Sequence, residues 1–313
     1  MLSTFKKTAY RGFNFVFLSE IALPELQVVN GIEEKADILI ELADLKDEWN
    51  ELAKSKRYYN VTGEKIWFYI PYTAIYCVCG GRKIIVSPMD GSHEEKIRLY
   101  ILGSCMGALL MQRKILPLHG SAVAIDGKAY AIVGDSGAGK STLASALLSR
   151  GYQLLSDDII PLSILKENIP VVTPTYPQQK LWRESLNAMG NMNNEYQPIF
   201  DRQEKFAVPV STQFSSQSIP LAGIFELIKT DTDEVKKFPI SGLRSLHILF
   251  YHTYRNFLID EAKLREWHFG VTANIANRIP VFQLCRPSSK FTAHELATLV
   301  LNNLGENEYD EKY

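Results

Sequence analysis

The chain has 313 residues, 46% of them hydrophobic, so it is long enough to bury one large core or two ordinary ones. Its 34 basic and 35 acidic residues give a formal net charge of -1. This balance, without a long run of one sign, excludes broad electrostatic attraction to nucleic acid or an anionic membrane, so any anion must be bound locally.

The N-terminus meets polar residues before it could form the apolar part of a signal peptide. The longest apolar stretch, 97–111, contains Arg98 and is too short to span a membrane. We therefore expect a cytoplasmic protein. No metal-site spacing joins the four cysteines, which are Cys77, Cys79, Cys105 and Cys285. Period-two alternation places Cys77 and Cys79 on one face of a strand, as reduced structural thiols.

Residues 1–93 hold short β-rich runs such as FNFVFL, KIWFYI and KIIVSP, separated by turn signals. They predict a small, mostly antiparallel β domain. Apolar residues then recur at helical spacing across 92–114. We assign 94–116 to a helix that connects the β domain to the rest of the chain.

Residues 117–313 begin with the strand-loop-helix pattern of an α/β nucleotide-binding fold. The predicted elements are a strand at 121–125, a turn at Asp126-Gly127, a strand at 129–133, a glycine loop, and a helix at 142–150 that Gly151 ends. The next strand, 152–156, is expected to end at Asp157. In open α/β sheets ligands bind at the carboxyl ends of strands, so the glycine loop and this aspartate should lie together.

The later chain is less informative. It predicts a short helix at 182–189, a polar loop at 191–197, a strand at 222–229, a helix over 241–257, and a frayed acidic tail at 306–313. Thr292 and Glu295 form a capping-box pattern that opens a terminal helix reaching Leu304.

The strongest motif is a P-loop, G-x-x-x-x-G-K-[ST], formed by Gly134, Asp135, Ser136, Gly137, Ala138, Gly139, Lys140 and Ser141. Its glycines let backbone N–H groups converge on phosphates, and the positive end of the helix that follows, from Thr142, faces the same anion. Lys140 is expected to bridge the terminal phosphates of ATP, and the Ser141 hydroxyl to bind Mg²⁺. A chance glycine turn is disfavoured, because a strand precedes the motif and a helix follows it.

Asp157 and Asp158 should point in opposite directions if strand pairing continues, so they can take different roles. We assign Asp158 to Mg²⁺ and Asp157 to a general base that accepts the proton of the attacking hydroxyl. His119 is a candidate partner of Asp157 if the adjacent strands bring their ends together. The alternatives are turn or capping roles for the aspartates and a structural role for the histidine.

Five cations beside aromatic residues and prolines complete the candidates: Lys180, Arg183, Arg202, Lys205 and Arg255. Phosphoryl transfer needs positive charge at the equatorial phosphate oxygens and a contact to the acceptor. We expect one or two of the five to face the cleft and the others to be solvated surface.

Residues 118–162, LHGSAVAIDGKAYAIVGDSGAGKSTLASALLSRGYQLLSDDIIPL, resemble the core of the HPr kinase/phosphorylase superfamily, which also looks like that of phosphoenolpyruvate carboxykinases. The resemblance implies proton transfer by His119 and Asp157, Mg²⁺ contacts from Asp158 and Ser141, and phosphate binding at 134–141.

Outside residues 118–162 the chain resembles a different group of relatives. The glycine-rich acidic signature of bacterial HPr kinases has no counterpart after the aspartates, which disfavours HPr as the substrate. The segments LLMQRKILPLHGSAV, PQQKLW, RQEKF and HTYR look instead like kinase relatives associated with lasso-peptide biosynthesis. Those relatives phosphorylate a serine of the precursor peptide, typically at its C-terminus.

The sequence thus predicts an α/β protein with a P-loop kinase core of the HPr kinase or PEP carboxykinase type and a small N-terminal β-rich domain. Using ATP and Mg²⁺, it would phosphorylate a peptide serine, with a lasso precursor as the expected partner. The alternatives are a kinase for an HPr-type protein or a small-molecule hydroxyl, and a regulatory ATP-binding protein without transfer, which the acid/base residues disfavour. No nucleic-acid or membrane partner is expected, and a homo-oligomer is left open.

Overall fold

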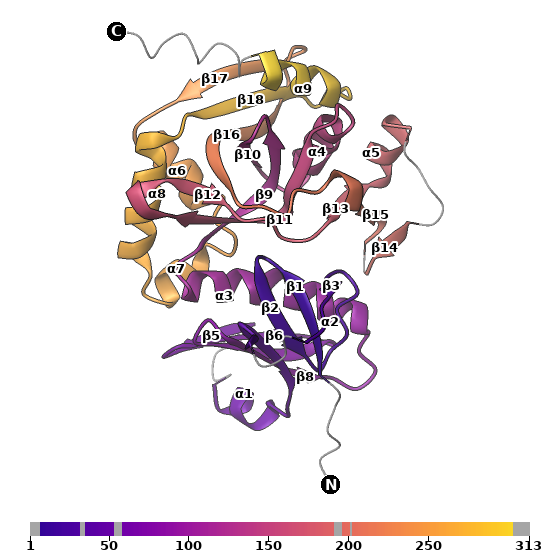
Figure 1. The fold of residues 1–313 in the computed structure, drawn as a ribbon, viewed down its shortest axis with the longest axis vertical. Helices are drawn as coiled ribbons and strands as arrows, with labels where there is room; N and C mark the ends of the chain where they lie inside the picture. The colour runs from indigo at the N-terminus through magenta and orange to yellow at the C-terminus, as the bar shows by residue number, and fades with distance from the viewer. Residues whose placement is uncertain (1–6, 32–34, 53–57, 191–195, 201, 303–313) are drawn as a thin grey trace.

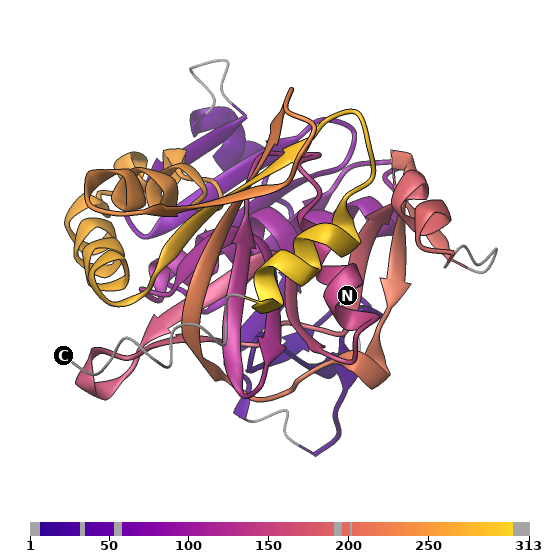
Figure 2. The same cartoon turned by 90° about the horizontal axis from the view of Figure 1, so that it is seen from above.

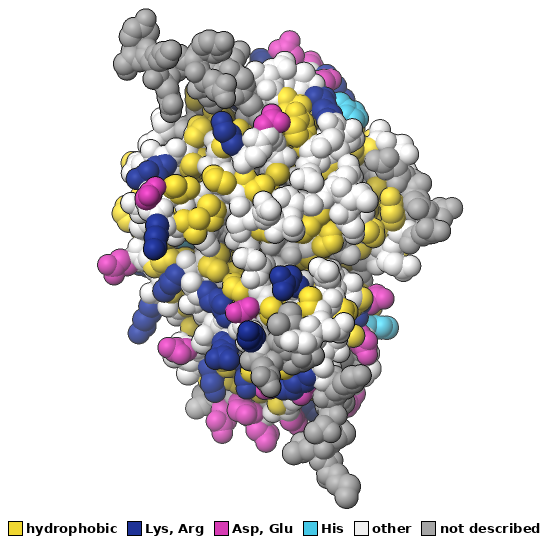
Figure 3. All heavy atoms as spheres, in the orientation of Figure 1, with side chains coloured by type: hydrophobic (Ala, Val, Ile, Leu, Met, Phe, Trp, Pro, Cys, Tyr) yellow, Lys and Arg dark blue, Asp and Glu magenta, His cyan; other side chains and the backbone are white. Residues whose placement is uncertain are grey.

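The computed structural model describes residues 7–31, 35–52, 58–190, 196–200 and 202–302, without the side chains of residues 202 and 203. It is an α/β fold with two large sheets, one at each end of the long axis of the molecule (Figure 1). Basic and acidic side chains are interspersed on the face shown in Figure 3. Among the described residues, no helix is long and apolar enough to cross a membrane.

The first sheet has the strand order β3-β1-β2-β4-β8-β7-β6-β5. Its strands are β1 (Thr8–Gly12), β2 (Phe15–Ser19), β3 (Gln27–Val28), β4 (Ile38–Leu42), β5 (Tyr59–Thr62), β6 (Lys65–Ile70), β7 (Ala74–Cys79) and β8 (Lys83–Pro88). Only the pairs β2–β4 and β4–β8 are parallel, so the sheet is mostly antiparallel, as the sequence predicts.

Strand β7 is buried on both faces. Tyr76 belongs to the core beneath the connecting helix, while Cys77 packs with Trp49 of α1 (Lys46–Leu52) on the other face. The Sγ atoms of Cys77 and Cys79 lie 3.3 Å apart, which confirms that the two thiols share one strand face.

The connecting helix is continuous and has a π-helical turn in its middle: α2 (Glu94–Tyr100), η2 (Ile101–Cys105) and α3 (Met106–Gln112). Its apolar residues share one core with Tyr76 of the first sheet and with Ile159 and Leu258 from the later chain. The predicted helix is confirmed. The domain boundaries at residues 93 and 116 stay a prediction, because this core draws on residues from both sides of them.

The second sheet has the order β10-β9-β11-β12-β16-β18-β17. Its strands are β9 (Leu116–Ile125), β10 (Lys128–Val133), β11 (Gln153–Ile164), β12 (Pro170–Val172), β16 (Ile219–Thr230), β17 (Lys236–Ile240) and β18 (Val281–Pro287). β9 pairs antiparallel with β10 and β11, and β10 also pairs parallel with β16. The pairings of β10, β9, β11, β12 and β16 therefore close into a ring.

The predicted end of a strand at Asp157 is wrong. β11 continues to Ile164 because its pairing with β9 persists through Asp157↔Ser121 and Asp158↔Gly120. The rule for carboxyl ends of strands therefore describes the glycine loop, which follows β10, but not the aspartates, which lie in the middle of β11.

The helices from α4 onward flank the second sheet (Figure 2). They are α4 (Lys140–Leu148), α5 (Arg183–Ala188), α6 (Leu243–Tyr251), α7 (Phe257–Glu261), α8 (Arg265–Arg278) and α9 (Ala293–Asn302), with 3-10 turns η3 (Lys166–Asn168) and η4 (Ser211–Gln213). A small third sheet has the order β13-β15-β14, with β13 (Gln178–Trp182), β14 (Gln197–Ile199) and β15 (Arg202–Pro209).

Several predicted boundaries need correction. Helix α4 begins at Lys140, two residues earlier than predicted, since the P-loop lysine already belongs to its first turn. Helix α6 ends at Tyr251 and not at 257, because Tyr254 N–H donates to the Pro117 carbonyl (2.8 Å) and ties the chain to β9. The predicted strand at 222–229 is confirmed within β16.

At α9 the Thr292 hydroxyl is buried without a hydrogen-bond partner, so the predicted capping-box contact is not made. The predicted loop at 191–197 falls largely, and Leu304 and the acidic tail fall entirely, outside the described residues.

Candidate active site

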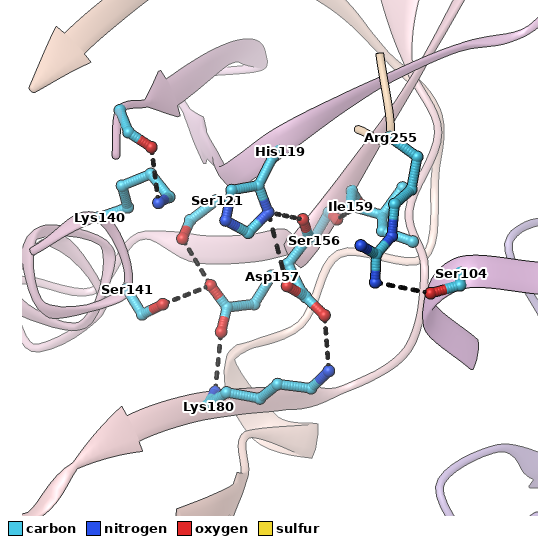
Figure 4. Close-up of polar contacts among 12 residues, drawn as sticks. Ser104, His119, Ser121, Lys140, Ser141, Ser156, Asp157, Ile159, Lys180 and Arg255 are labelled. Carbon is cyan, nitrogen blue, oxygen red and sulfur yellow. Dashed lines mark hydrogen bonds and ion pairs between the residues drawn. The ribbon is translucent and has the colours of Figure 1, made fainter. Parts of the chain in front are cut away.

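A cavity of about 880 Å³ lies where the P-loop, the middle of β9 and β11, and the segment after α6 meet. Most P-loop residues line it, together with His119, Asp157 and Asp158. Figure 4 shows side chains converging from β9 (His119, Ser121), β11 (Asp157), β13 (Lys180) and the start of α4 (Lys140, Ser141). The candidate residues from the sequence are therefore brought together at one place.

The P-loop adopts a backbone that requires glycine. Gly134, Gly137 and Gly139 all have positive φ, and a Cβ on Gly134 would lie 2.4 Å from the carbonyl oxygen of Leu227. No side chain caps the N-terminus of α4, so its first N–H groups remain directed at the loop. This arrangement suits a phosphate group.

The Lys140 ammonium lies over the loop that it follows. It donates to the carbonyl oxygens of Gly134 (2.8 Å) and Asp135 (3.0 Å), and burial lowers the pKa of this lysine. A phosphate anion in the loop would provide an additional charged partner for the ammonium.

Asp157 is buried and accepts three hydrogen bonds (Figure 4). The Ser141 hydroxyl donates to Oδ1 at 2.9 Å, the Ser121 hydroxyl donates to the same oxygen at 2.5 Å, and the Lys180 N–H donates to Oδ2 at 2.7 Å. Burial raises the pKa of Asp157, and these donors oppose that shift. The carboxylate is thus fixed in position beside the P-loop serine.

Asp158 has a different environment. Its Oδ2 pairs with the Lys180 ammonium at 2.7 Å, and its Oδ1 lies 3.6 Å from Nδ1 of His119. Burial alone would raise the pKa of Asp158, but the positive charge of Lys180 outweighs it, and the pKa is lowered. Asp158 is therefore held as a carboxylate.

His119 Nδ1 also lies 3.0 Å from the carbonyl oxygen of Asp158. Because a carbonyl only accepts, we assign the proton to Nδ1 and leave Nε2 as the acceptor nitrogen. Burial lowers the pKa of His119, which favours the neutral ring.

Two expectations about the aspartates are wrong. His119 lies beside Asp158 and not beside Asp157. The two carboxylates also do not point to opposite faces, since both line one cavity and Lys180 contacts both. The reason is local: Asp158 has φ of 79°, which interrupts the strand alternation on which the expectation relied.

The five downstream cations divide into separate environments. Lys180, Lys205 and Arg255 line the cavity. Arg183 is outside the lining, where it pairs with Glu204 at 2.6 Å and covers the Phe206 ring. The side chain of Arg202 lies outside the described part of the structure. Arg255, with φ of 56°, donates to the Ser104 hydroxyl of the π-helical turn at 2.8 Å.

Five further residues that line the site or contact it were not predicted from the sequence: Ser104, Ser121, Lys229, Tyr254 and Arg286. Ser121 could have been found, since it stands two residues after His119 on one strand face. Arg286 could not, because its Nε donates to the Ala138 carbonyl (2.7 Å) only through the parallel pairing of β16 with β18.

The side chains present fit a nucleotide-bound Mg²⁺. The Ser141 hydroxyl and the Asp157 carboxylate offer two adjacent oxygen ligands. No group of three or more His, Cys, Asp or Glu residues able to hold a metal ion occurs within the described ranges. Mg²⁺ is commonly held by one or two protein oxygens together with substrate phosphates and water.

No family model matches the chain. Local sequence matches do occur with HPr kinase/phosphorylases. The protein from Mycoplasmopsis pulmonis is 39% identical over 70 residues, 22% of this chain and 23% of that protein. The protein from Lactobacillus gasseri is 31% identical over 97 residues, 28% of this chain and 30% of that protein. The protein from Nitrosomonas europaea is 27% identical over 155 residues, 45% of this chain and 46% of that protein.

The chain thus spans less than half of the length of each of these relatives. A solved structure of the Hpr(Ser) kinase/phosphatase from Coxiella burnetii overlaps 61% of this chain and 98% of its own, with 17% identity and a TM-score of 0.34.

Proposed function

We propose that the chain is an ATP-dependent kinase with a core of the HPr kinase type, which transfers the γ-phosphoryl group to a serine hydroxyl of a peptide. The observation that carries the proposal is the division of one cavity into two carboxylate sites. Asp157 lies against Ser141 of the P-loop, and Asp158 lies against His119. The local matches to HPr kinase/phosphorylases support it.

In this proposal the two aspartates exchange the roles assigned from the sequence. Asp157 shares a hydrogen bond with Ser141, so it is the carboxylate placed to hold Mg²⁺ with that hydroxyl. Asp158 lies beside the histidine, and its lowered pKa keeps it ionised. Because it lines the cavity away from the Ser141–Asp157 pair, we assign it to accept the proton of the acceptor hydroxyl.

The remaining side chains position the triphosphate and the two aspartates and neutralise negative charge. Lys140 turns from the loop carbonyls to the terminal phosphates, and the loop N–H groups hold the triphosphate in line. Bound Mg²⁺ supplies charge neutralisation at the phosphate oxygens. Lys180 fixes both aspartates through its N–H and its ammonium, and His119 orients Asp158 through its Nδ1–H.

A peptide acceptor is supported by the end of the cavity next to the connecting helix. Tyr100 and Ser104 of the connecting helix line the cavity together with Arg255, His119 and Asp158. Aromatic and cationic side chains at this end suit a chain that carries an anionic group near its hydroxyl. The narrower form of the proposal, the C-terminal serine of a lasso precursor, rests on the sequence resemblance.

Phosphorylation of matched acceptors tests the proposal. With γ-labelled ATP and Mg²⁺, we expect label on a peptide that ends in serine and none on the same peptide ending in alanine. Label on HPr or on a small alcohol would move the assignment to those acceptors. ATP binding without label on any hydroxyl would favour the regulatory alternative and overturn the kinase.

A further inference from the structure

We infer that the nucleoside of the bound nucleotide lies at the α5/α9 end of the cavity, with its base against Phe291. This inference rests on the proposed function and assigns to it a nucleobase subsite. The cavity has two chemically different ends. At one end lie His119, Asp158 and Arg255. The other end, which we call the apolar end, is formed by Leu143, Ala188, Phe291, Ala293 and Leu296.

The P-loop decides which end receives the base. Lys140 and Ser141 mark the terminal phosphates, and Asp158 marks the acceptor beyond them. The nucleoside must therefore extend from the loop away from Asp158. The apolar end offers an aromatic base a surface of leucine, alanine and phenylalanine side chains beside the P-loop helix.

Both walls of the apolar end are tied to the P-loop. The Thr142 and Ser185 hydroxyls share a hydrogen bond of 2.8 Å, which joins α5 to the first turn of α4. On the other side Arg286 donates to the Ala138 carbonyl at 2.7 Å, which places the loop 288–292 beside the phosphates. Helix α9, which follows that loop, packs on α4.

Phe291 and Thr292 are the residues expected to recognise the base. Phe291 is 42% exposed at the cavity wall, and an exposed aromatic ring there offers a stacking surface. Thr292 is 3% exposed, and its hydroxyl has no hydrogen-bond partner. An unpaired buried hydroxyl is costly, and a nucleoside would bring polar groups to it. Because the hydroxyl is shielded from solvent, that contact requires a rotation about χ1.

The test compares ATP with inorganic tripolyphosphate, which has the phosphates but no base, by isothermal titration calorimetry with Mg²⁺. Phe291→Ala should weaken ATP binding about tenfold, as base stacking contributes, and leave tripolyphosphate binding within about twofold. Thr292→Val, which keeps the side-chain shape, should weaken ATP binding about threefold or more. Phe269→Ala, which removes a ring that is 63% exposed on α8 and outside the cavity, should change neither ligand.

The possible results distinguish the nucleobase subsite from the proposed kinase function. If wild-type protein binds ATP and tripolyphosphate, and Phe291→Ala and Thr292→Val bind ATP as tightly as wild type, the subsite is wrong and the kinase stands. If both variants lose tripolyphosphate as much as ATP, the effect lies in the phosphate loop and the subsite is also wrong. If wild-type protein binds neither ligand, the subsite and the proposed function both fail.

Discussion

The hydroxyl of Ser141 donates a 2.9 Å hydrogen bond to Oδ1 of Asp157, and this contact joins the P-loop helix to the middle of β11. It places one carboxylate where a nucleotide-bound cation would lie. The neighbouring residue Asp158 is turned by its positive φ toward His119, so two consecutive acids serve two places in one cavity.

Asp157→Asn should raise the Mg²⁺ concentration needed for half-maximal activity by about tenfold or more, because the amide is a weaker ligand beside Ser141. A Mg²⁺ titration at saturating ATP measures this. Asp135→Asn, a change in the P-loop away from that oxygen pair, is the control and should leave the Mg²⁺ requirement unchanged. An unaltered requirement in Asp157→Asn would remove this residue from the cation site.

Ser104→Ala should raise the KM for the acceptor several-fold while the Kd for ATP stays unchanged. Ser104 holds the Arg255 guanidinium at the acceptor end, and loss of one hydrogen bond costs about 1 kcal/mol. Steady-state kinetics and ATP titration separate the two effects. Ser289→Ala, at the opposite end of the cavity, should leave the acceptor KM unaltered. A Ser104→Ala enzyme with normal KM would show that Arg255 needs no such support.

Gly120→Ala should destabilise the protein by about 3 kcal/mol or more, since its Cβ would lie 2.1 Å from the backbone oxygen of Ile132 and force β9 and β10 apart. Urea unfolding measures the change. Gly270→Ala is the matched control, because a Cβ there has no neighbour within 4 Å. On helix α8 it should be neutral or stabilise by about 0.5–1 kcal/mol. Equal stability of the two variants would contradict the close packing at Gly120.

The stability of the fold should fall as the pH falls from 6.5 towards 4. Burial lowers the pKa of His268 to about 4, and in the unfolded chain it returns to about 6.5. The unfolded state binds more protons in this window, so the stabilising effect of the neutral ring is present above pH 6.5 and is lost by about 3 kcal/mol at pH 4. Urea unfolding across this range should show a flatter profile for His268→Asn. Parallel profiles would argue against this origin of the pH dependence.

Much of this site could be predicted from local pattern. The P-loop, the strand on either side of Asp126-Gly127 and the helix after Ser141 follow from spacing and turn chemistry alone. The partners of the aspartates could not be predicted, because they depend on one non-glycine residue, Asp158, in a positive-φ conformation that alternation rules do not foresee.

Contacts that join distant segments were also beyond the sequence. Arg286 reaches the P-loop through the parallel pairing of β16 with β18, and Ser104 reaches Arg255 from a π-helical turn 151 residues away in the chain. Neither the strand order nor the π-helical turn has a short-range signal that we used. The phosphate site could therefore be identified from residue types, whereas the residues that surround it depend on the fold.

Single-turnover phosphoryl transfer by Asp158→Asn, measured with saturating ATP and a serine acceptor, tests the central claim most directly. The amide keeps the shape of the carboxylate but cannot accept the hydroxyl proton. The account predicts an ATP Kd within about threefold of wild type and a transfer step slower by about a hundredfold or more. Transfer at the wild-type rate by this variant would contradict the assignment of Asp158 as the proton acceptor.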